Sequence, residues 1–404
     1  MKTHLSRLFS EFLRSEQASG FVLILCTIAS LGMANSSFGA GYADFWHTKI
    51  GFETGSLALK HSIGHWINDG LMAIFFLLIG LEIERELYVG ELSDRKNAVL
   101  PVFAAVGGML VPALCHFLLN RGTETQSGIA IPMATDIAFA LGILALLGNR
   151  IPLSLKIFLT ALAIIDDLGA IVIIALFYGG DFSLFYFTLA GGTFMGLLAL
   201  NRLGVNRLSV YIVSGVFLWY FMLNSGIHAT LAGVLLAFAV PFRKGDEKSP
   251  SYRLQHFLHK PVAFIIMPIF ALANTGIVLA ENWVEGLATL NSLGIFTGLY
   301  IGKPLGIVLF CLLAVGMGLS RLPGEVSWRH IVGAGFLGGI GFTMSIFISL
   351  LAFVNPETVG YAKTTVLLSS LLSALTGFLI LHTSTTGKTV DPDPPGHSPR
   401  GASE

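Results

Sequence analysis

Charged side chains are scarce in this sequence. Asp, Glu, Lys and Arg make up only 12% of its 404 residues, and hydrophobic residues make up 54%. Soluble domains usually carry about 25% charged residues. So few charges do not cover the water-facing surface of a chain this long, and the mean hydropathy is +0.76. The composition therefore excludes a soluble globular protein and predicts an all-α polytopic membrane protein.

Cysteine and excess charge of either sign are also lacking. The three cysteines (Cys26, Cys115 and Cys311) lie far apart in apolar runs, without the spacing of metal ligands. They indicate neither a disulfide framework nor a metal site. The formal net charge is zero, so nothing indicates a nucleic-acid partner. We expect no cofactor.

The sequence does contain long apolar runs. A helix needs about 20 apolar residues to cross a bilayer, and this length predicts twelve transmembrane helices within a domain at 18–384. No cleavage site follows the first run, so we interpret it as a membrane helix rather than a signal peptide. The predicted spans are 18–36, 63–86, 98–119, 127–147, 153–178, 184–201, 207–223, 226–242, 261–280, 292–315, 329–353 and 362–383.

The basic residues predict the orientation. With the N-terminus inside, most of the 24 lysines and arginines lie on the cytoplasmic side, as the positive-inside rule requires. Both termini are then cytoplasmic: residues 1–17 and a tail, 385–404, whose proline-rich polar sequence predicts disorder. The basic residues outside this pattern are Lys49, Lys60, Arg121 and Lys363, which face outwards, and Lys303, which lies within a span.

One long external connection, residues 38–62, stands outside the bundle. Alternating residues near Ile50–Leu59, with Gly51 and Gly55, predict a short β-hairpin. A lone hairpin is only marginally stable. We therefore expect the region near 45–60 to pair with a second copy and form a homodimer.

Two predicted spans are interrupted. Span 127–147 contains Pro132, Thr135 and Asp136, and span 329–353 has five glycines between positions 333 and 341. Unwound backbone persists in a membrane only where protein or water satisfies its hydrogen bonds. Each interrupted span is the middle helix of a three-helix unit, 98–178 or 292–383, and the units start on opposite sides. This pattern predicts inverted-topology repeats with a binding site where the two breaks meet, although glycine-rich packing without a repeat is the alternative.

Four ionisable residues lie near the middle of their spans: Asp136, Asp166, Asp167 and Lys303. Each charge at the bilayer centre costs at least ~2.5–3.5 kcal/mol. Salt bridging with one lysine accounts for one carboxylate, not three. The remaining acid must hold protons or bind a cation, so we predict exchange of one for the other, with purely structural polar packing as the alternative. Oxygen ligands suit a hard ion, and adjacent carboxylates titrate as a coupled pair.

Other polar residues are less specific. Asp69 and Glu82 lie towards opposite ends of the second span and line entry funnels or sit among headgroups. His228 opens a span at the outer surface, where packing is favoured over sensing. His256 and His259 have the helical spacing of metal ligands, but no third ligand accompanies them, so we interpret them as part of a solvated cytoplasmic face.

Six ordered segments resemble the NhaA family of bacterial sodium/proton antiporters. The most specific is the aspartate-pair run ALAIIDDLGAIVIIALFY. The others are WINDGLMAIFFLLIGLEIEREL, ATDIAFALGILALLG, SGIHATLAG, IGKPLGI and GIGFTMSIFI. Together they extend over nearly the whole chain outside the tail. Inverted repeats are a known feature of this family.

The resemblance implies a core of two inverted three-helix units with crossing, interrupted fourth and eleventh helices. It implies that Asp166 and Asp167 bind Na⁺ or Li⁺ and protons. Asp136 and Lys303 would balance the helix-end dipoles at the breaks, with Lys303 also pairing with Asp166. Thr135 would support the first break.

The resemblance further implies an electrogenic antiporter in the bacterial inner membrane, in contact with its lipids. It would export sodium, form homodimers through the external hairpin, and be switched off at acidic pH. That regulation is linked to Glu82, Arg85 and the cytoplasmic end of the ninth helix, where Gln255 stands in place of a frequent glutamate. A transporter of another small solute is the alternative. An intramembrane aspartyl protease is disfavoured because its GxGD signature is absent.

Overall fold

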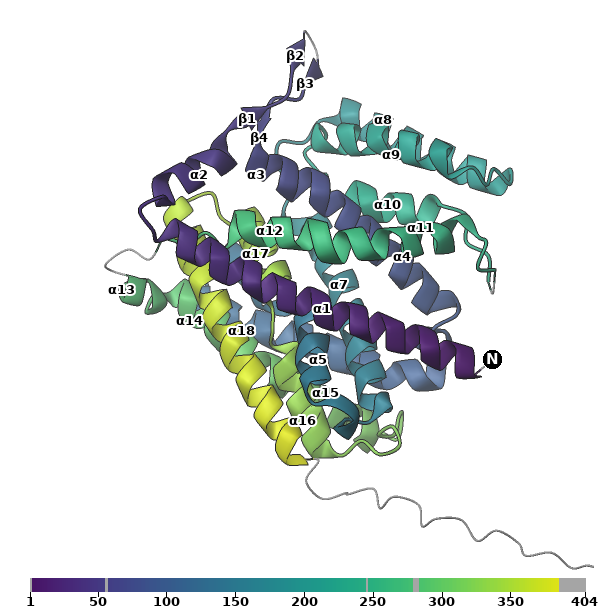
Figure 1. The fold of residues 1–404 in the computed structure, drawn as a ribbon, viewed down its shortest axis with the longest axis vertical. Coiled ribbons are helices and arrows are strands. Elements are labelled where there is room, and N and C mark those ends of the chain that lie inside the picture. Colours follow the sequence, from purple (N-terminus) through teal and green to yellow (C-terminus); the bar gives the residue numbers. More distant parts are fainter. Residues whose placement is uncertain (1, 55–56, 245, 279–282, 385–404) are drawn as a thin grey trace, which may run out of the picture.

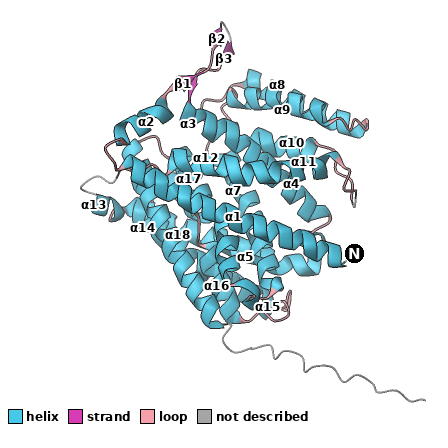
Figure 2. Ribbon diagram, viewed as in Figure 1, coloured by secondary structure: helices cyan, strands magenta, loops and turns pink. Residues whose placement is uncertain are grey.

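The computed structural model describes residues 2–54, 57–244, 246–278 and 283–384. This part is almost entirely helical (Figure 2), and most of its long helices lie side by side as one bundle (Figure 1). The expected disordered tail, 385–404, lies outside the described residues.

The helices that could cross a membrane fall into three groups. Uninterrupted helices are α1 (Lys2–Ala34), α5 (Arg95–Asn120), α7 (Leu153–Phe177), α8 (Leu184–Arg202), α9 (Leu208–Leu223), α10 (Leu231–Ala239) and α18 (Pro356–Ser384). Three stretches contain a π-helical turn: α3–η1–α4 (Ile63–His65, Trp66–Leu71, Met72–Tyr88), α11–η5–α12 (Pro250–Pro261, Val262–Ile266, Met267–Asn274) and α14–η6–α15 (Leu290–Phe296, Thr297–Gly302, Lys303–Gly316). Two are broken: η3 with α6 (Glu124–Met133, Ile137–Leu146) and α16 with α17 (Trp328–Gly338, Phe342–Ala352).

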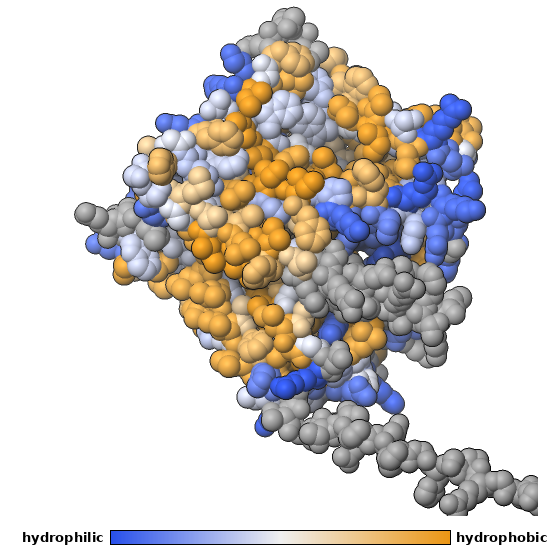
Figure 3. Space-filling view, viewed as in Figure 1, coloured by the Kyte–Doolittle hydropathy of each residue, from blue (hydrophilic) through white to orange (hydrophobic). Residues whose placement is uncertain are grey.

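These units correspond in chain order to the twelve predicted spans. Seven described helices are long and apolar enough to cross a membrane, and three bent pairs raise the number to ten. The apolar helices α9 and α10 are shorter. The prediction of an all-α, polytopic membrane fold is confirmed. Apolar side chains cover much of the face in Figure 3, and hydrophilic ones gather towards its edges.

Two predicted boundaries are wrong. The ninth helix runs over Pro250–Asn274 rather than 261–280, because Ser249 caps it and Pro250 suits its first turn. The first half of this helix is polar, so a search for long apolar runs does not detect it. The eighth helix, α10, covers only Leu231–Ala239 of the predicted 226–242.

The two broken helices meet at their breaks. Each pair bends by 43°, and the backbone nitrogen of Asp136 in one break donates to the carbonyl oxygen of Ile340 in the other, at 2.7 Å. The backbone groups released by one break are thus partly satisfied by the other, as the bilayer requires.

Helices α5 and α15 pack closely beside the breaks. A Cβ atom added to Gly107 would meet the carbonyl oxygen of Gly306, and one added to Gly306 would meet that of Gly107. Small residues permit such close backbone approach in membrane bundles. The crossing lies one turn from Lys303 and holds that lysine near the breaks.

The segment 38–62 contains a short helix that the sequence did not predict, α2 (Gly39–His47), and continues as a β-hairpin with two short pairs of strands. Strand β1 (Lys49–Ile50) pairs antiparallel with β4 (His61–Ser62), and β2 (Glu53–Thr54) pairs with β3 (Leu57–Ala58). The hairpin projects from the bundle at the top of Figure 1. The remaining short helices are η2 (Glu91–Ser93), η4 (Gly148–Arg150) and α13 (Trp283–Leu287).

Candidate ion-exchange site

Lys303 and Asp166 form a fully buried ion pair beside the first break. The Lys303 Nζ and Asp166 Oδ2 atoms are 2.6 Å apart, and both side chains are 0% exposed. Lys303 also donates to the carbonyl oxygen of Met133, at the end of η3. The ammonium group therefore lies at a helix C-terminus, where the dipole favours a cation.

Thr135 connects this pair to the second break. Its hydroxyl lies 2.7 Å from Asp166 Oδ2 and 2.8 Å from the carbonyl oxygen of Gly338, the last residue of α16. A hydroxyl has one hydrogen to donate, so these two acceptors compete for it. The hydroxyl group of Thr135 thus contacts acceptors at both breaks.

Asp136 lies at the opposite kind of helix end. It is the N-cap of α6, where Oδ1 accepts from the backbone nitrogen of Phe139 at 3.1 Å. Its Oδ2 accepts from the backbone nitrogen and the hydroxyl of Thr343, at the start of α17. A carboxylate is stabilised at helix N-termini, so Asp136 and Lys303 carry charges opposite to the helix ends that they contact.

Asp167 faces a cavity rather than this network. The cavity has a volume of about 710 Å³, and its lining includes Asp167, Asp136 and Thr135 but not Asp166. Asp167 is only 2% exposed, and its Oδ1 atom has no hydrogen-bond partner within the described chain. Successive residues of a helix point about 100° apart, which explains why the adjacent aspartates have different surroundings.

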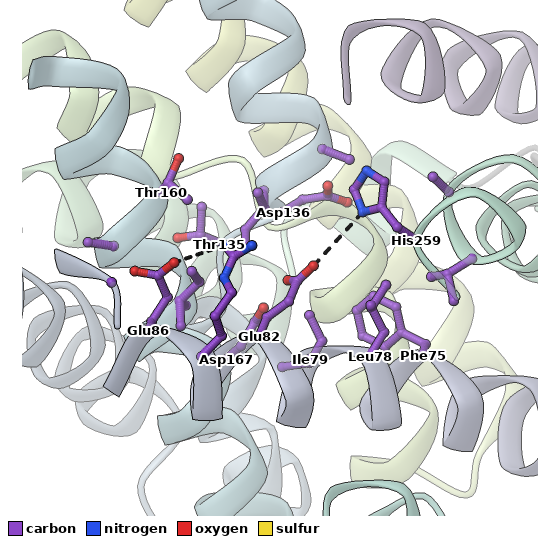
Figure 4. A pocket seen from close by; sticks show the side chains of 18 of the residues that line it. Phe75, Leu78, Ile79, Glu82, Glu86, Thr135, Asp136, Thr160, Asp167 and His259 are labelled. Carbon is purple, nitrogen blue, oxygen red and sulfur yellow. Dashed lines mark hydrogen bonds and ion pairs between the residues drawn. The ribbon is translucent and has the colours of Figure 1, made fainter. Parts of the chain in front are cut away.

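The cavity reaches from the surface to the breaks. Its outer lining includes Val89, Asp94 and Asn97, which are exposed near the α4–α5 connection. Asp167 and Asp136 both line the cavity, as Figure 4 shows. A buried carboxylate oxygen without a partner can accept a proton or coordinate a small hard cation.

The sequence comparisons agree with this geometry. The family described as Na⁺/H⁺ antiporter 1 matches residues 10–381. A protein named Na(+)/H(+) antiporter NhaA from Dechloromonas aromatica is 58% identical over 384 residues, 94% of this chain and 97% of the relative. A protein named Na(+)/H(+) antiporter NhaA 1 from Flavobacterium johnsoniae is 56% identical, over 93% of this chain and 97% of the relative. A protein named Na(+)/H(+) antiporter NhaA from Escherichia coli is 50% identical, over 93% of this chain and 97% of the relative.

The chain belongs to the NhaA family of Na⁺/H⁺ antiporters.

In this family member, Glu82 lines the same cavity as Asp167. Its Oε1 atom lies 3.9 Å from His259 Nδ1, as Figure 4 shows, and its side chain lies near Gln255. Arg85 contacts Glu86 at 2.9 Å. Glu82 therefore meets the ninth helix unit at one wall of the cavity, and Arg85 lines the same cavity.

The two histidines of the ninth helix unit have different environments. His259 lines the cavity and is partly buried, whereas the sequence predicts a solvated cytoplasmic face for both histidines. His256 is exposed and stacks against Tyr252. No group of three or more His, Cys, Asp or Glu side chains suited to a metal ion occurs in the part of the chain that the structure describes.

Asp69 lies outside the cavity lining, towards the N-terminal end of the second helix unit. Its carboxylate lies 3.0 Å from His65 Nδ1 and 3.5 Å from His228 Nε2. His228 also lies 2.8 Å from the hydroxyl of Thr230. The structure thus brings Asp69 and His228 into contact, and no sequence pattern predicts an interaction between them.

Sequence reasoning missed His65 and Thr343. The i,i+4 spacing of His65 and Asp69 is a usable signal for their contact. Thr343 stands two residues after Gly341, the last glycine of the second break. A polar residue at that place is a signal for a helix cap, since the cap position needs a partner for free backbone groups.

Proposed function

We propose that this chain is a secondary transporter that exports Na⁺ or Li⁺ from the cell in exchange for protons, with Asp167 as the principal ion ligand. The supporting observation is the unpartnered Asp167 oxygen at the inner end of a cavity, beside two helix breaks. The relatives described above are named Na⁺/H⁺ antiporters.

The exchange follows from the cost of burial. An ionised carboxylate is unfavourable in a low-dielectric interior unless a cation or a proton neutralises it. Asp167 would therefore carry either a sodium ion or a proton when its access changes sides. Because one carboxylate oxygen serves both, the ions compete, and the gradient of one drives the other.

Asp166 and Lys303 supply a second exchangeable charge. While they are paired at 2.6 Å, the ammonium group occupies the place beside Asp166 that a cation would take. A sodium ion that binds both aspartates would displace Lys303, which then gives up its proton. Asp136 and Thr135 would keep the helix ends stable during this change.

The cavity would open to the cytoplasm, with both termini on that side of a bacterial inner membrane. This orientation is supported by the basic residues of the connections on the side of the cavity mouth, including Arg202, Arg207 and Arg243. The Asp69–His228 contact would lie in the closed external route. Glu82, Arg85, His256 and His259 would adjust activity to pH at the cytoplasmic wall.

The test measures proton flux in everted membrane vesicles with Na⁺, Li⁺, K⁺ or Ca²⁺ added. We expect Na⁺ and Li⁺ to release protons, and K⁺ and Ca²⁺ to have no effect. Asp167→Asn should abolish the response while the protein still inserts. Asp181→Asn, in an exposed connection, should respond as the unmodified chain does.

Normal exchange by inserted Asp167→Asn protein would contradict the assignment of Asp167. Absence of any cation response in the unmodified chain, with uptake of an organic solute instead, would favour the transporter of another small solute.

A further inference from the structure

Glu84 is a buried carboxylate that the proposed exchange does not use. It lies on α4 and is 6% exposed. It does not line the cavity, although Glu82, Arg85 and Glu86 on the same helix do. Among the described residues it forms no ion pair. Burying such a group is costly unless its contacts compensate, so its contacts are informative.

The partner of Glu84 is Ser251, in the first turn of α11. The Ser251 hydroxyl donates to Glu84 Oε2 at 3.0 Å, and both residues are buried. The backbone nitrogen of Ser251 already donates to the carbonyl oxygen of Pro241 at 3.2 Å. The hydroxyl is therefore the group of Ser251 that is available to α4. A carboxylate near a helix N-terminus is also favoured by the helix dipole.

Ser251 starts a stripe along the face of α11 that meets α4. Ser251, Gln255 and His259 are spaced by four residues, so they lie on one side of the helix. Gln255 lies near Glu82, and His259 Nδ1 lies 3.9 Å from Glu82 Oε1. The contact between Glu84 and Ser251 thus belongs to the interface between α4 and α11. These two helices lie close together in Figure 1.

We propose that Glu84 is a positioning residue that sets the pH dependence of exchange: its bond to Ser251 fixes the start of α11, and so the register of Gln255 and His259 against Glu82. This inference rests on the proposed function and adds to it a residue that regulates the same site. The titratable and charged groups near Glu82 and His259 are Arg85, Glu86, Asp167, His256 and Lys260.

The effect has a definite sign. Polar and positively charged groups near a carboxylate favour its ionised form. When α11 loses its anchor, Gln255 and His259 no longer stay beside Glu82, and Glu82 holds its proton to higher pH. If exchange requires ionised Glu82, activity then begins at more alkaline pH.

The test compares the pH profile of sodium-driven proton flux in vesicles for four variants. Glu84→Ala and Ser251→Ala should each move the half-maximal pH upwards by about 0.5 unit or more, an about threefold change in proton affinity. Their combination should move it no further, because both break the same contact. Glu84→Gln keeps an oxygen that accepts from Ser251 and should retain the original profile. The control, Glu247→Ala, removes an exposed carboxylate just before α11 and should also leave it unchanged.

An unchanged half-maximal pH in Ser251→Ala overturns the inference, whatever Glu84→Ala does and even if the maximal rate falls. So does an equal shift in Glu84→Gln and Glu84→Ala. If Glu84→Ala does not insert, Ser251→Ala and Glu84→Gln decide the matter. Failure of the proposed function itself is distinct, since the unmodified chain would then show no sodium-driven flux at any pH.

Discussion

Asp136 and Thr343 join the two interrupted helices through one carboxylate. Asp136 Oδ2 accepts from the Thr343 backbone nitrogen at 3.1 Å and from its hydroxyl, although the residues are 207 positions apart. With Oδ1 on the first turn of α6, the side chain serves two helix N-termini at once. Neither half-helix therefore leaves its first donors unpaired in the bilayer.

Thr343→Val tests this junction. The substitution removes the hydroxyl donor and keeps the backbone one, so we expect a loss of roughly 1.5–3 kcal/mol, typical of a hydrogen bond to a charged group. Asp136→Asn should cost more, because it removes the charge that faces both N-termini. The measurement is the apparent melting temperature in detergent. As a control, Thr188→Val changes an exposed threonine of α8 and should melt as the unmodified chain does; equal melting of Thr343→Val and the control would contradict the junction.

The buried pair predicts a non-additive response. Lys303→Met leaves Asp166 without its cation at 0% exposure, and breaking one side of such a pair typically costs ~3–5 kcal/mol. Adding Asp166→Asn removes the stranded charge and should restore most of the melting temperature without restoring electrogenic exchange. A double variant as unstable as Lys303→Met would show that the lysine stabilises the fold through other contacts. Lys260→Met, at an exposed lysine, is the matched control.

The sequence predicts the fold well where helices are uniformly apolar. Helix α7 and the long α18 lie where the long apolar runs predict transmembrane helices. It fails for α11, whose first half is polar, and for α10, which is half as long as a full span. These helices are stabilised by burial inside the bundle, and that burial is a property of the assembled structure rather than of the local sequence.

The candidate site is predicted only in part for the same reason. The cost of intramembrane charge identifies Asp136, Asp166, Asp167 and Lys303 without any structure. The different environments of Asp166 and Asp167, and the role of Thr343, depend on contacts between distant segments. No local pattern encodes which oxygen faces the cavity.

The hairpin predicts how two copies of the chain associate. Its apolar side chains Ile50 and Phe52 are 54% and 59% exposed, and both lie outside the predicted transmembrane spans. Pairing with a second copy would cover them. Replacing residues 51–60 with an Asn-Gly turn keeps the β1–β4 pair and should convert dimers to monomers that still exchange ions. Native mass spectrometry in detergent reads the result; a persistent dimer would place the interface elsewhere. Leu184→Ser, at an exposed α8 side chain, should not change the oligomeric state.

The separate environments of Asp166 and Asp167 lead to a prediction about voltage. If sodium binding releases one proton from Asp167 and another from the Asp166–Lys303 pair, each cycle exchanges one positive charge for two. A net charge then crosses the membrane, and the cycle couples to the potential by ~2.3 kcal/mol per 100 mV. An inside-negative potential would draw protons in and drive sodium out even where the pH gradient is small.

Solid-supported-membrane recordings test this charge count directly. We expect a sodium concentration jump to evoke a current in the unmodified chain, and the flux in vesicles to change when the potential is clamped at zero. A variant with both Lys303→Met and Asp166→Asn keeps Asp167 as the single titrating carboxylate, so any exchange that it retains should be electroneutral and carry no current. A sodium-driven flux that is independent of voltage in the unmodified chain would mean that only one proton moves per sodium ion, and that the Lys303–Asp166 pair stays closed throughout the cycle.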